Sequence, residues 1–396
     1  MQTQQESSPI PAHLVCAIRP GKSIQELAQE LTAIQTRKKD FTVPVGLLSA
    51  KVIHGRAPKA ALEEIGDTTS PSDQVALSFK NGQDHDFTLN TWSSSQVAQF
   101  TDIPGPYFKR LADESPDLLA KNINHGMARI TRDEESKSRL LRTIDGRVRG
   151  FLSHRYRPLD GHDLMEAVMP MLIDHQFQVV SCELTERRLY LKTATQRIQG
   201  EVKTGDVVSY GVMISTSDVG AGALRVEPYF LRLWCLNGAV SESKFRRAHL
   251  GRSTAEREVQ ELLTDSTKLL NDKAFFATVR DYMSHTMKPE VFAAELDKMK
   301  DAANRPIKNL DLETVVEHTM KTVGISGQGI KKGILEALAD GNQNAGLTQW
   351  GLMNSFTAAA KMPSIDYDTA TDLERAGGQI LNLTKNQWHH IAEVSH

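Results

Sequence analysis

One stretch of the sequence decides the fold: Phe177-Gln-Val-Val-Ser-Cys-Glu-Leu184, then Thr185-Glu186, then Arg187-Arg-Leu-Tyr-Leu-Lys-Thr-Ala-Thr195. Apolar and polar residues alternate along both runs, which is the period of a strand with one buried face. Two residues separate the runs, the length of a tight turn. The stretch therefore predicts a β-hairpin whose two strands contribute to a common core.

Elements on both sides extend this hairpin into a sheet with helices. Asp160–His175 has the spacing of an amphipathic helix, Val207–Ser215 and Leu224–Leu236 read as two more strands, and a long helix is expected from Ala255 to His285. The order is helix, three or four strands, helix. We therefore predict an α+β fold in which a central antiparallel β-sheet with a β-hairpin is packed by helices.

Two prolines lie inside these predicted elements. Pro170 should kink or split the first helix, because proline lacks the amide hydrogen that a helix interior needs. Pro228 should mark an edge or a bulge of the fourth strand. Each proline thus predicts a local irregularity.

The flanking regions carry their own signals. Ser23 and Glu26 form a capping-box pattern at the start of a helix over residues 23–36, and Asn81-Gly82 predicts a turn between strands Val75–Phe79 and Asp86–Leu89. Residues 93–128 read as short helices, and from residue 291 helical runs alternate with Gly-rich breaks. A mainly helical C-terminal region is therefore expected.

Two of the short helices also suggest a helix-turn-helix, with Lys109 and Arg110 on the second helix. Pro104 and Pro106 are unusual in such a turn. Short helical hairpins are mainly packing elements, so base reading by these helices is the weaker alternative.

The chain of 396 residues exceeds one typical core, so we expect more than one domain. We divide it into an N-terminal mixed α/β region (1–128), a basic α+β core (129–257) and an acidic, mainly helical C-terminal region (258–396). Their formal net charges are −2, +5 and −5. The positive charge is thus confined to the middle of the chain.

Arginine is concentrated in two segments of that middle region, residues 129–157 with net +5 and residues 244–257 with net +4. Its planar, permanently charged fork suits phosphate oxygens, whereas the alternative is a solvated, salt-bridged face. We predict that nucleic acid is bound by Arg147, Arg149, Arg155, Arg157, Arg187, Arg188, Lys192, Arg246, Arg247 and Arg252.

Aromatic residues lie among the same strands. We expect one or two to stack on bases and most to fill the core. The candidates are Tyr156, Tyr190, Tyr210, Tyr229 and Trp234.

The acidic C-terminal region is not expected to bind phosphate, because like charges repel. We expect it to pack against the core, join subunits or recruit a basic partner. Trp350, Met353 and Phe356 share a helical face, a spacing typical of a core. Removing residues 291–396 should leave binding intact if the central region folds alone.

Membrane and disulfide classes are not supported. No apolar run approaches about 18 residues and the N-terminal stretch is polar, so we expect a cytoplasmic protein that does not enter a membrane. Cys16, Cys182 and Cys235 contain no CxxC pair, which argues against a disulfide framework and a zinc site.

Catalytic motifs are also missing. Gly324–Gly333 fails the P-loop spacing and reads as a connection between helices. Asp206, Asp218 and Glu227 could form a nuclease set, but no lysine follows Glu227, and Arg225 is expected to neutralise Glu227. We therefore expect no catalytic residue, no metal and no cofactor.

Several runs carry a resemblance to a known family. They are Gly150-Phe-Leu-Ser-His-Arg-Tyr-Arg-Pro-Leu-Asp160, Val219-Gly-Ala-Gly-Ala-Leu-Arg-Val-Glu-Pro-Tyr229 with Leu233-Trp-Cys-Leu-Asn-Gly238, and Gln349-Trp-Gly-Leu-Met-Asn-Ser-Phe-Thr357 with Leu373-Glu-Arg-Ala-Gly377. The chain resembles, over residues 35–385, a phage- and plasmid-borne family catalogued as domain of unknown function 932. The resemblance implies a mobile-element protein, among which replication and recombination functions are common.

The predicted order of helix, three strands and helix is also similar to the core of ring-forming single-strand annealing proteins, which include the phage lambda Beta protein and the eukaryotic Rad annealing factors. That similarity is one of topology alone. We therefore predict a non-enzymatic phage or plasmid protein that binds single-stranded DNA and promotes annealing in recombination or replication. It should self-associate into a ring or filament and meet host or phage recombination and replication proteins. The alternative is a regulatory protein of a mobile element that binds a host protein.

Overall fold

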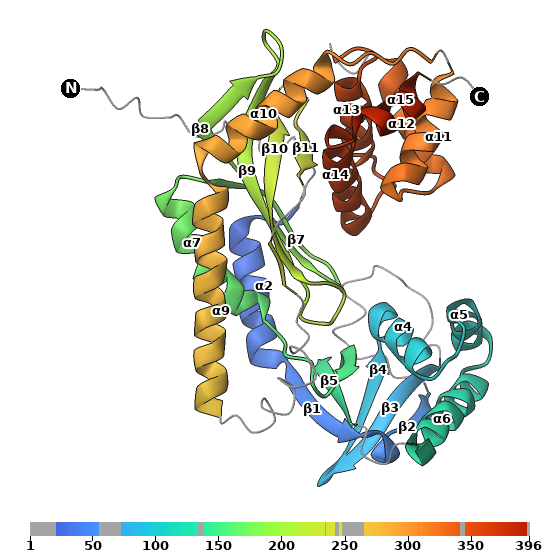
Figure 1. Ribbon diagram of the computed structural model, residues 1–396. Coiled ribbons are helices and arrows are strands. Elements are labelled where there is room, and N and C mark those ends of the chain that lie inside the picture. The colour runs from blue at the N-terminus through green and yellow to red at the C-terminus, as the bar shows by residue number, and fades with distance from the viewer. Residues whose placement is uncertain are drawn as a thin grey trace.

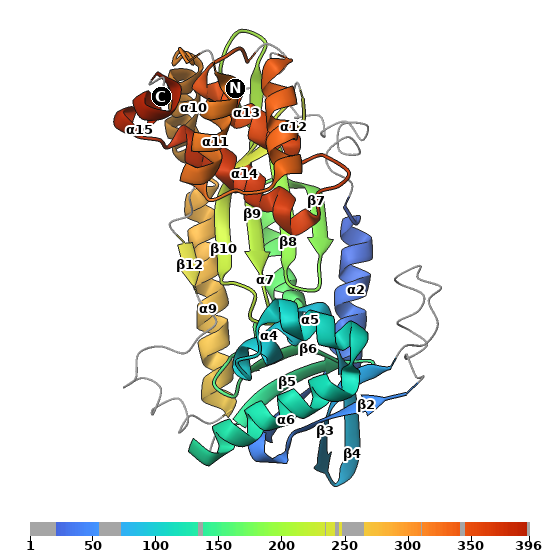
Figure 2. The same cartoon turned by 90° about the vertical axis from the view of Figure 1, so that its right-hand side faces the viewer.

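The structure is a computed structural model that describes residues 21–54, 73–133, 138–233, 235–241, 245–247, 265–309, 311–340 and 345–393. Two sheets and the helices around them form an α+β fold, as the sequence predicts (Figure 1). The first sheet lies at one end of the molecule, the second sheet at its centre, and a group of C-terminal helices at the other end (Figure 2).

The first sheet has the strand order β1-β5-β6-β4-β3-β2, and only β4 and β6 run parallel. Its strands are β1 (Lys39–Pro44), β2 (Ser49–Ile53), β3 (Gln74–Asn81), β4 (Gln83–Leu89), β5 (Ser138–Ile144) and β6 (Arg147–Ser153). The 3-10 turn η1 (Val45–Leu47) follows β1. Three helices pack beside this sheet: α4 (Thr91–Phe100), α5 (Gly105–Glu114) and α6 (Pro116–Asp133). The predicted hairpin at Asn81-Gly82 is confirmed, with Gly82 at a φ of 69°.

This sheet is strongly curved. Three strands separate β1 from β3 in its order, yet the rings of Phe41 and Phe79 lie 5.3 Å apart. The Phe41 ring also lies 5.0 Å from that of His85 in β4. Strand β1 at one end of the sheet therefore approaches β3 and β4 near the other end, and Leu77, Leu141 and neighbouring residues are buried in the same core.

The second sheet contains the predicted hairpin and has the order β11-β10-β9-β8-β7, with β12 paired to the remaining edge of β10. Its strands are β7 (Gln178–Leu184), β8 (Leu189–Glu201), β9 (Val207–Thr216), β10 (Leu224–Arg232), β11 (Asn237–Val240) and β12 (Phe245–Arg247). All its neighbouring strands are antiparallel, which confirms the predicted central sheet.

Three helices from separate parts of the chain lie along one face of the second sheet: α2 (Ile24–Arg37), α7 (Gly161–Asp174) and α9 (Asp265–Thr286). The capping box of Ser23 and Glu26 at the start of α2 is confirmed. Leu27, Leu31 and Val168 are fully or almost fully buried against the sheet. The helix that the sequence predicts over 255–285 is described from Asp265 onward, and its earlier part lies outside the described residues.

The C-terminal helices are α10 (Pro289–Ala303), α11 (Leu312–Val323), α12 (Gln328–Ala339), α13 (Gln349–Ala359), α14 (Tyr367–Leu381) and α15 (Lys385–Ala392). Trp350, Met353 and Phe356 are buried, so the predicted core face of α13 is confirmed. Gly324 ends α11 in the left-handed conformation and Gly327 precedes α12, so residues 324–327 form the predicted connection, whereas residues 328–333 belong to α12.

The two prolines have different outcomes: Pro170 does not split its helix, whereas Pro228 lies at a break in the outer pairing of β10, in line with the predicted edge or bulge. Pro170 lies inside α7, which is a single helix rather than two. Pro170 and Glu166, whose carbonyl would lose its partner, are both exposed, so water can satisfy that carbonyl. Pro228 lies between the residues of β10 that pair with β12 and those that pair with β11, where an amide hydrogen is not needed.

The domain boundaries predicted at residues 128 and 257 do not separate structural units. Strands β5 and β6 complete the first sheet, so that sheet spans residue 128. One apolar core joins Leu31, Leu172, Val212 and Phe356, so it spans residue 257 as well. The net charge along the sequence does not mark the boundaries of packed units, because charged residues lie mainly at the surface and not in the core.

Candidate nucleic-acid interface

The loop of residues 217–222, between β9 and β10, is the meeting point of the two sheets. The Val219 carbonyl accepts hydrogen bonds from the Trp92 indole (2.8 Å) and the Gln96 amide (2.9 Å), both on α4. The Ser217 carbonyl accepts one from the Tyr156 hydroxyl (2.8 Å). Gly220 at the loop tip is exposed and has a φ of 80°, a conformation that favours glycine. The loop is thus fixed from the side of the first sheet.

A buried arginine anchors the same loop. Arg142 of β5 has a side chain only 1% exposed, and its guanidinium pairs with Asp40 (3.2 Å), Asp160 (2.7 Å) and Asp218 (3.0 Å). Burial alone would raise the pKa of Asp160, but Arg142 and Lys38 hold the pKa below its usual value. The buried Arg142 and its three carboxylate partners form a structural ion-pair cluster. Leaving any one of these charges buried without its partner would destabilise the fold.

Three of the ten predicted binding residues make contacts within the fold and do not form a free surface. Arg149 is largely buried and donates to the Asp218 carboxylate, and burial, with repulsion from Arg142, lowers the pKa of Arg149 to about 10. Arg188 donates to the Ala221 carbonyl (2.6 Å). Lys192 is 1% exposed and its ammonium lies 2.5 Å from the Glu374 carboxylate of α14. Lys192 therefore cannot contact a polymer in this structure, and the prediction for it is wrong.

Four predicted residues remain on accessible positions, and we name them the arginine rim: Arg147, Arg155, Arg157 and Arg187. The last three are chain neighbours of Tyr156 or Arg188, which contact the loop, and Arg147 is the first residue of β6. Arg147 is partly exposed and makes no ion pair with a described residue. Arg155 is exposed and Arg157 partly exposed, on either side of the loop-bound Tyr156. Arg187, in the β7–β8 turn, is exposed, and its guanidinium lies 4.9 Å from the centre of the Trp92 ring. The rim thus combines cations from two sheets, three of them next to residues that contact the loop.

Three predicted residues lie farther along the chain. Arg246 and Arg247 belong to β12, where the register sets Arg246 opposite Arg225 and Arg247 opposite Leu224. Arg252 lies outside the described residues, as does the candidate aromatic Trp234.

The four candidate tyrosines are core residues. Tyr156, Tyr190, Tyr210 and Tyr229 are buried, and burial raises their pKa values. Trp92 was missed, although its position in a helical piece, four residues before Gln96 and eight before Phe100, marks one helix face.

The three acidic residues weighed as a nuclease set are held apart, each by its own arginine. Asp206 pairs with Arg232 (2.5 Å), Asp218 with Arg142, and Glu227 with Arg375 of α14 (2.6 Å). Arg225, the expected partner of Glu227, lies farther away at 3.8 Å. These carboxylates therefore form no common metal site.

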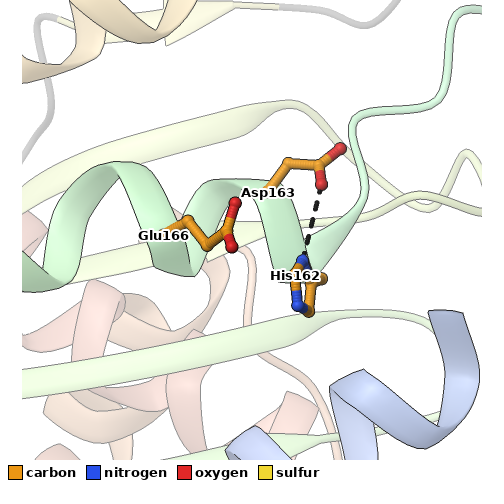
Figure 3. Close-up of side chains that lie close together, drawn as sticks. All are labelled: His162, Asp163 and Glu166. Carbon is orange, nitrogen blue, oxygen red and sulfur yellow. Dashed lines mark ion pairs between the residues drawn. The ribbon is translucent and has the colours of Figure 1, made fainter.

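One further cluster has ligand types that a metal could use. His162, Asp163 and Glu166 lie in the first turns of α7 with ligand atoms within 4.8 Å of one another (Figure 3). Asp163 and Glu166 are solvent-facing, and carboxylates at a helix N-terminus are stabilised by its dipole without a cation. His162 also borders a small pocket, partly open to solvent, beside Arg149 and Asp160. We assign no ligand to either feature.

No protein-family model, curated protein or solved structure matches the chain. Within the described parts of the chain, every helix is too short or too polar to cross a bilayer.

Proposed function

We propose that the protein binds single-stranded nucleic acid, DNA in the first instance, by contacts of the arginine rim to the phosphate backbone. The observation that carries the proposal is Arg187: an exposed guanidinium, without a carboxylate partner among the described residues, held over the Trp92 ring. Basic side chains beside an aromatic ring are the usual ingredients of a single-strand binding surface.

The contrast among the arginines supports this proposal. Arg142, Arg232 and Arg375 are buried and paired with carboxylates, so their charge is already compensated within the fold. Arg187 of the rim is exposed and has no carboxylate partner among the described residues, so an external anion can reach it. Phosphate contacts of this kind are independent of base sequence, as annealing of arbitrary complementary strands requires.

The proposal extends to annealing by an assembly of subunits during recombination or replication of a phage or plasmid, in the cytoplasm of its host. Sheet edges support self-association. The β7 edge is paired at one position by the bridge between Lys22 and Cys182, whereas β2 ends the first sheet, and β11 and β12, which together pair with the outer edge of β10, end the second. A neighbouring copy that adds a strand at such an edge would build a ring or filament.

The test is a fluorescence-anisotropy titration with labelled single-stranded and duplex oligonucleotides, beside light scattering with and without DNA. We expect tighter binding of the single strand and a particle larger than the 44.0 kDa chain. The triple variant R155A/R157A/R187A should lose most of the affinity, whereas R197A, an exposed arginine away from the loop on β8, should retain it. Unchanged binding by the folded triple variant would refute the rim. Absence of any DNA binding, together with capture of an acidic protein, would favour the regulatory alternative.

A further inference from the structure

One face of α4 carries three residues in a row: Trp92, Gln96 and Phe100, each four positions from the next. Gln96 fixes this face, because its amide accepts a hydrogen bond from the Phe151 amide of β6 (2.8 Å) and donates to Val219 (2.9 Å). Trp92 and Phe100 therefore lie at the two ends of a rigid surface, about 12 Å apart along the helix axis at about 1.5 Å per residue.

Each end of this surface holds an arginine. Arg187 lies over Trp92, as described above. At the other end Arg139 of β5 lies between two rings, 4.4 Å from the centre of Phe100 and 4.8 Å from that of Phe151. Arg139 was not among the predicted binding residues. Arg139 comes from a strand of the first sheet and Arg187 from a turn of the second, and both contact rings of the same helix.

Arg139 is an incompletely matched cation. It is partly exposed, it donates to the Phe151 carbonyl (3.2 Å), its Nε atom is buried without a partner, and it makes no ion pair with a described residue. Burial lowers the pKa of Arg139 to about 10. The guanidinium remains charged at neutral pH and would gain from an anion placed at its accessible edge.

We infer that Arg139 and Arg187 are two phosphate subsites for one single strand, which runs along α4 and crosses the loop at Gly220. The inference rests on the proposed function and adds its path and minimum length. The aromatic rings hold both guanidinium planes in fixed orientations, so less side-chain freedom is lost when phosphate binds. Phosphates of a stacked strand advance by about 3.4 Å per nucleotide, so a span of about 12 Å covers several nucleotides.

Acidic neighbours limit the path at the Arg187 end. Glu186 lies in the same turn, and Asp368 of α14 accepts hydrogen bonds from the Tyr190 hydroxyl (2.5 Å) and the Thr185 hydroxyl (3.4 Å). A polyanion is repelled from that side, which favours a course toward Arg139 over one toward α14.

The experiment compares a thymidine dinucleotide with a thymidine dodecamer on R139Q, R187Q and the double variant. A dodecamer can occupy both subsites, so each single variant should weaken it about tenfold, whereas a dinucleotide occupies one subsite at a time and should weaken by about twofold at most. Arg110, an exposed arginine stacked on Tyr107 of α5 at 5.3 Å, supplies the matched control R110Q, which should leave both ligands unaffected.

Three outcomes decide the matter. Equal losses of affinity for the dinucleotide and the dodecamer, or no loss of dodecamer affinity in R139Q, would overturn the two-subsite inference. The proposed function would still be tested separately by the rim triple variant. If R139Q fails to fold by circular dichroism, R139K decides instead, since it keeps the charge but lacks the fork; dodecamer binding equal to wild type would then overturn the inference. Competition by polyglutamate as effective as that by the dodecamer would indicate an acidic protein ligand and would also overturn it.

Discussion

Arg142 donates from a single nitrogen, Nη1, to both the backbone carbonyl (2.9 Å) and the carboxylate (3.0 Å) of Asp218. Arg142 belongs to the first sheet, and Asp218 lies in the loop between two strands of the second. The relative position of the two sheets, and hence of the arginine rim, depends on this contact.

We predict that Arg142→Ala destabilises the protein by about 3–5 kcal/mol, because it leaves three carboxylates without their buried cation. Chemical denaturation measures the loss. The control is Arg37→Ala, which breaks the more exposed pair with Asp145 and should cost less than about 1 kcal/mol. Similar losses in the free energy of unfolding for the two variants would contradict a structural role of the Arg142 ion pairs.

Acid should weaken the ion pairs between Arg142 and its carboxylate partners. The pKa of Asp160 is held below its ordinary value in the folded protein, so its contribution to stability is complete above about pH 4, the unfolded value, and is lost as the pH falls through the lower folded value. Urea midpoints measured from neutral pH down to about pH 2.5 should therefore differ between wild type and Asp160→Asn at neutral pH and converge in acid. A difference that stays constant with pH would show that Asp160 does not titrate in this way.

We predict that Lys192 contributes to the stability of the fold and not to the affinity for DNA. Lys192→Met leaves Glu374 buried without its partner and is expected to cost about 3–5 kcal/mol. The double variant K192M/E374M removes both charges and should recover much of that loss. If its oligonucleotide affinity equals that of wild type, Lys192 is no part of the interface; a weaker affinity in this folded variant would restore it as a candidate.

The expected independence of the central region needs revision. Helix α14 covers the face of the second sheet opposite α7 and α9, and Arg375 and Glu374 of that helix neutralise Glu227 and Lys192 of the sheet. Deleting residues 291–396 should therefore give an insoluble or molten chain instead of a DNA-binding core. A soluble truncation with a cooperative thermal transition would contradict this prediction.

The basic edge strand offers a test that salt can decide. If Arg246 and Arg247 neutralise phosphates of a single strand, replacing both with Ala should lower the slope of log affinity against log salt by about 0.7 for each phosphate that is no longer neutralised. Anisotropy titrations at four or five salt concentrations measure the slope. A slope equal to that of wild type in the folded double variant would show that Arg246 and Arg247 neutralise no phosphate, which would leave the arginine rim as the phosphate-binding surface.

Local signals made much of the fold predictable from sequence. The hairpin of β7 and β8, the capping box at Ser23 and the turn at Gly82 each depend on residues close together in the chain. The pairing of β1 with β5 could not be predicted, because a strand pattern does not reveal a partner about 100 residues away.

The site was harder to predict for a similar reason. An arginine in the sequence shows its charge but not the carboxylate that compensates it. Arg142 and Arg187 look alike in the sequence, yet Arg142 is buried with aspartates 102, 18 and 76 residues away, whereas Arg187 is exposed and has no carboxylate partner among the described residues. Distant partners, which only the tertiary structure brings together, therefore decide which cations remain available to a ligand.

The covering of the second sheet by α14 has a consequence for the order of synthesis on the ribosome. Strands β7 to β11 leave the exit tunnel well before residues 367–381, so their charged face, with Lys192 and Glu227, stays in contact with water during that interval. A nascent chain in this state exposes charged groups and part of an apolar core, the kind of surface that chaperones bind. Completion of the core, and with it protection from proteolysis, waits for α14 to emerge.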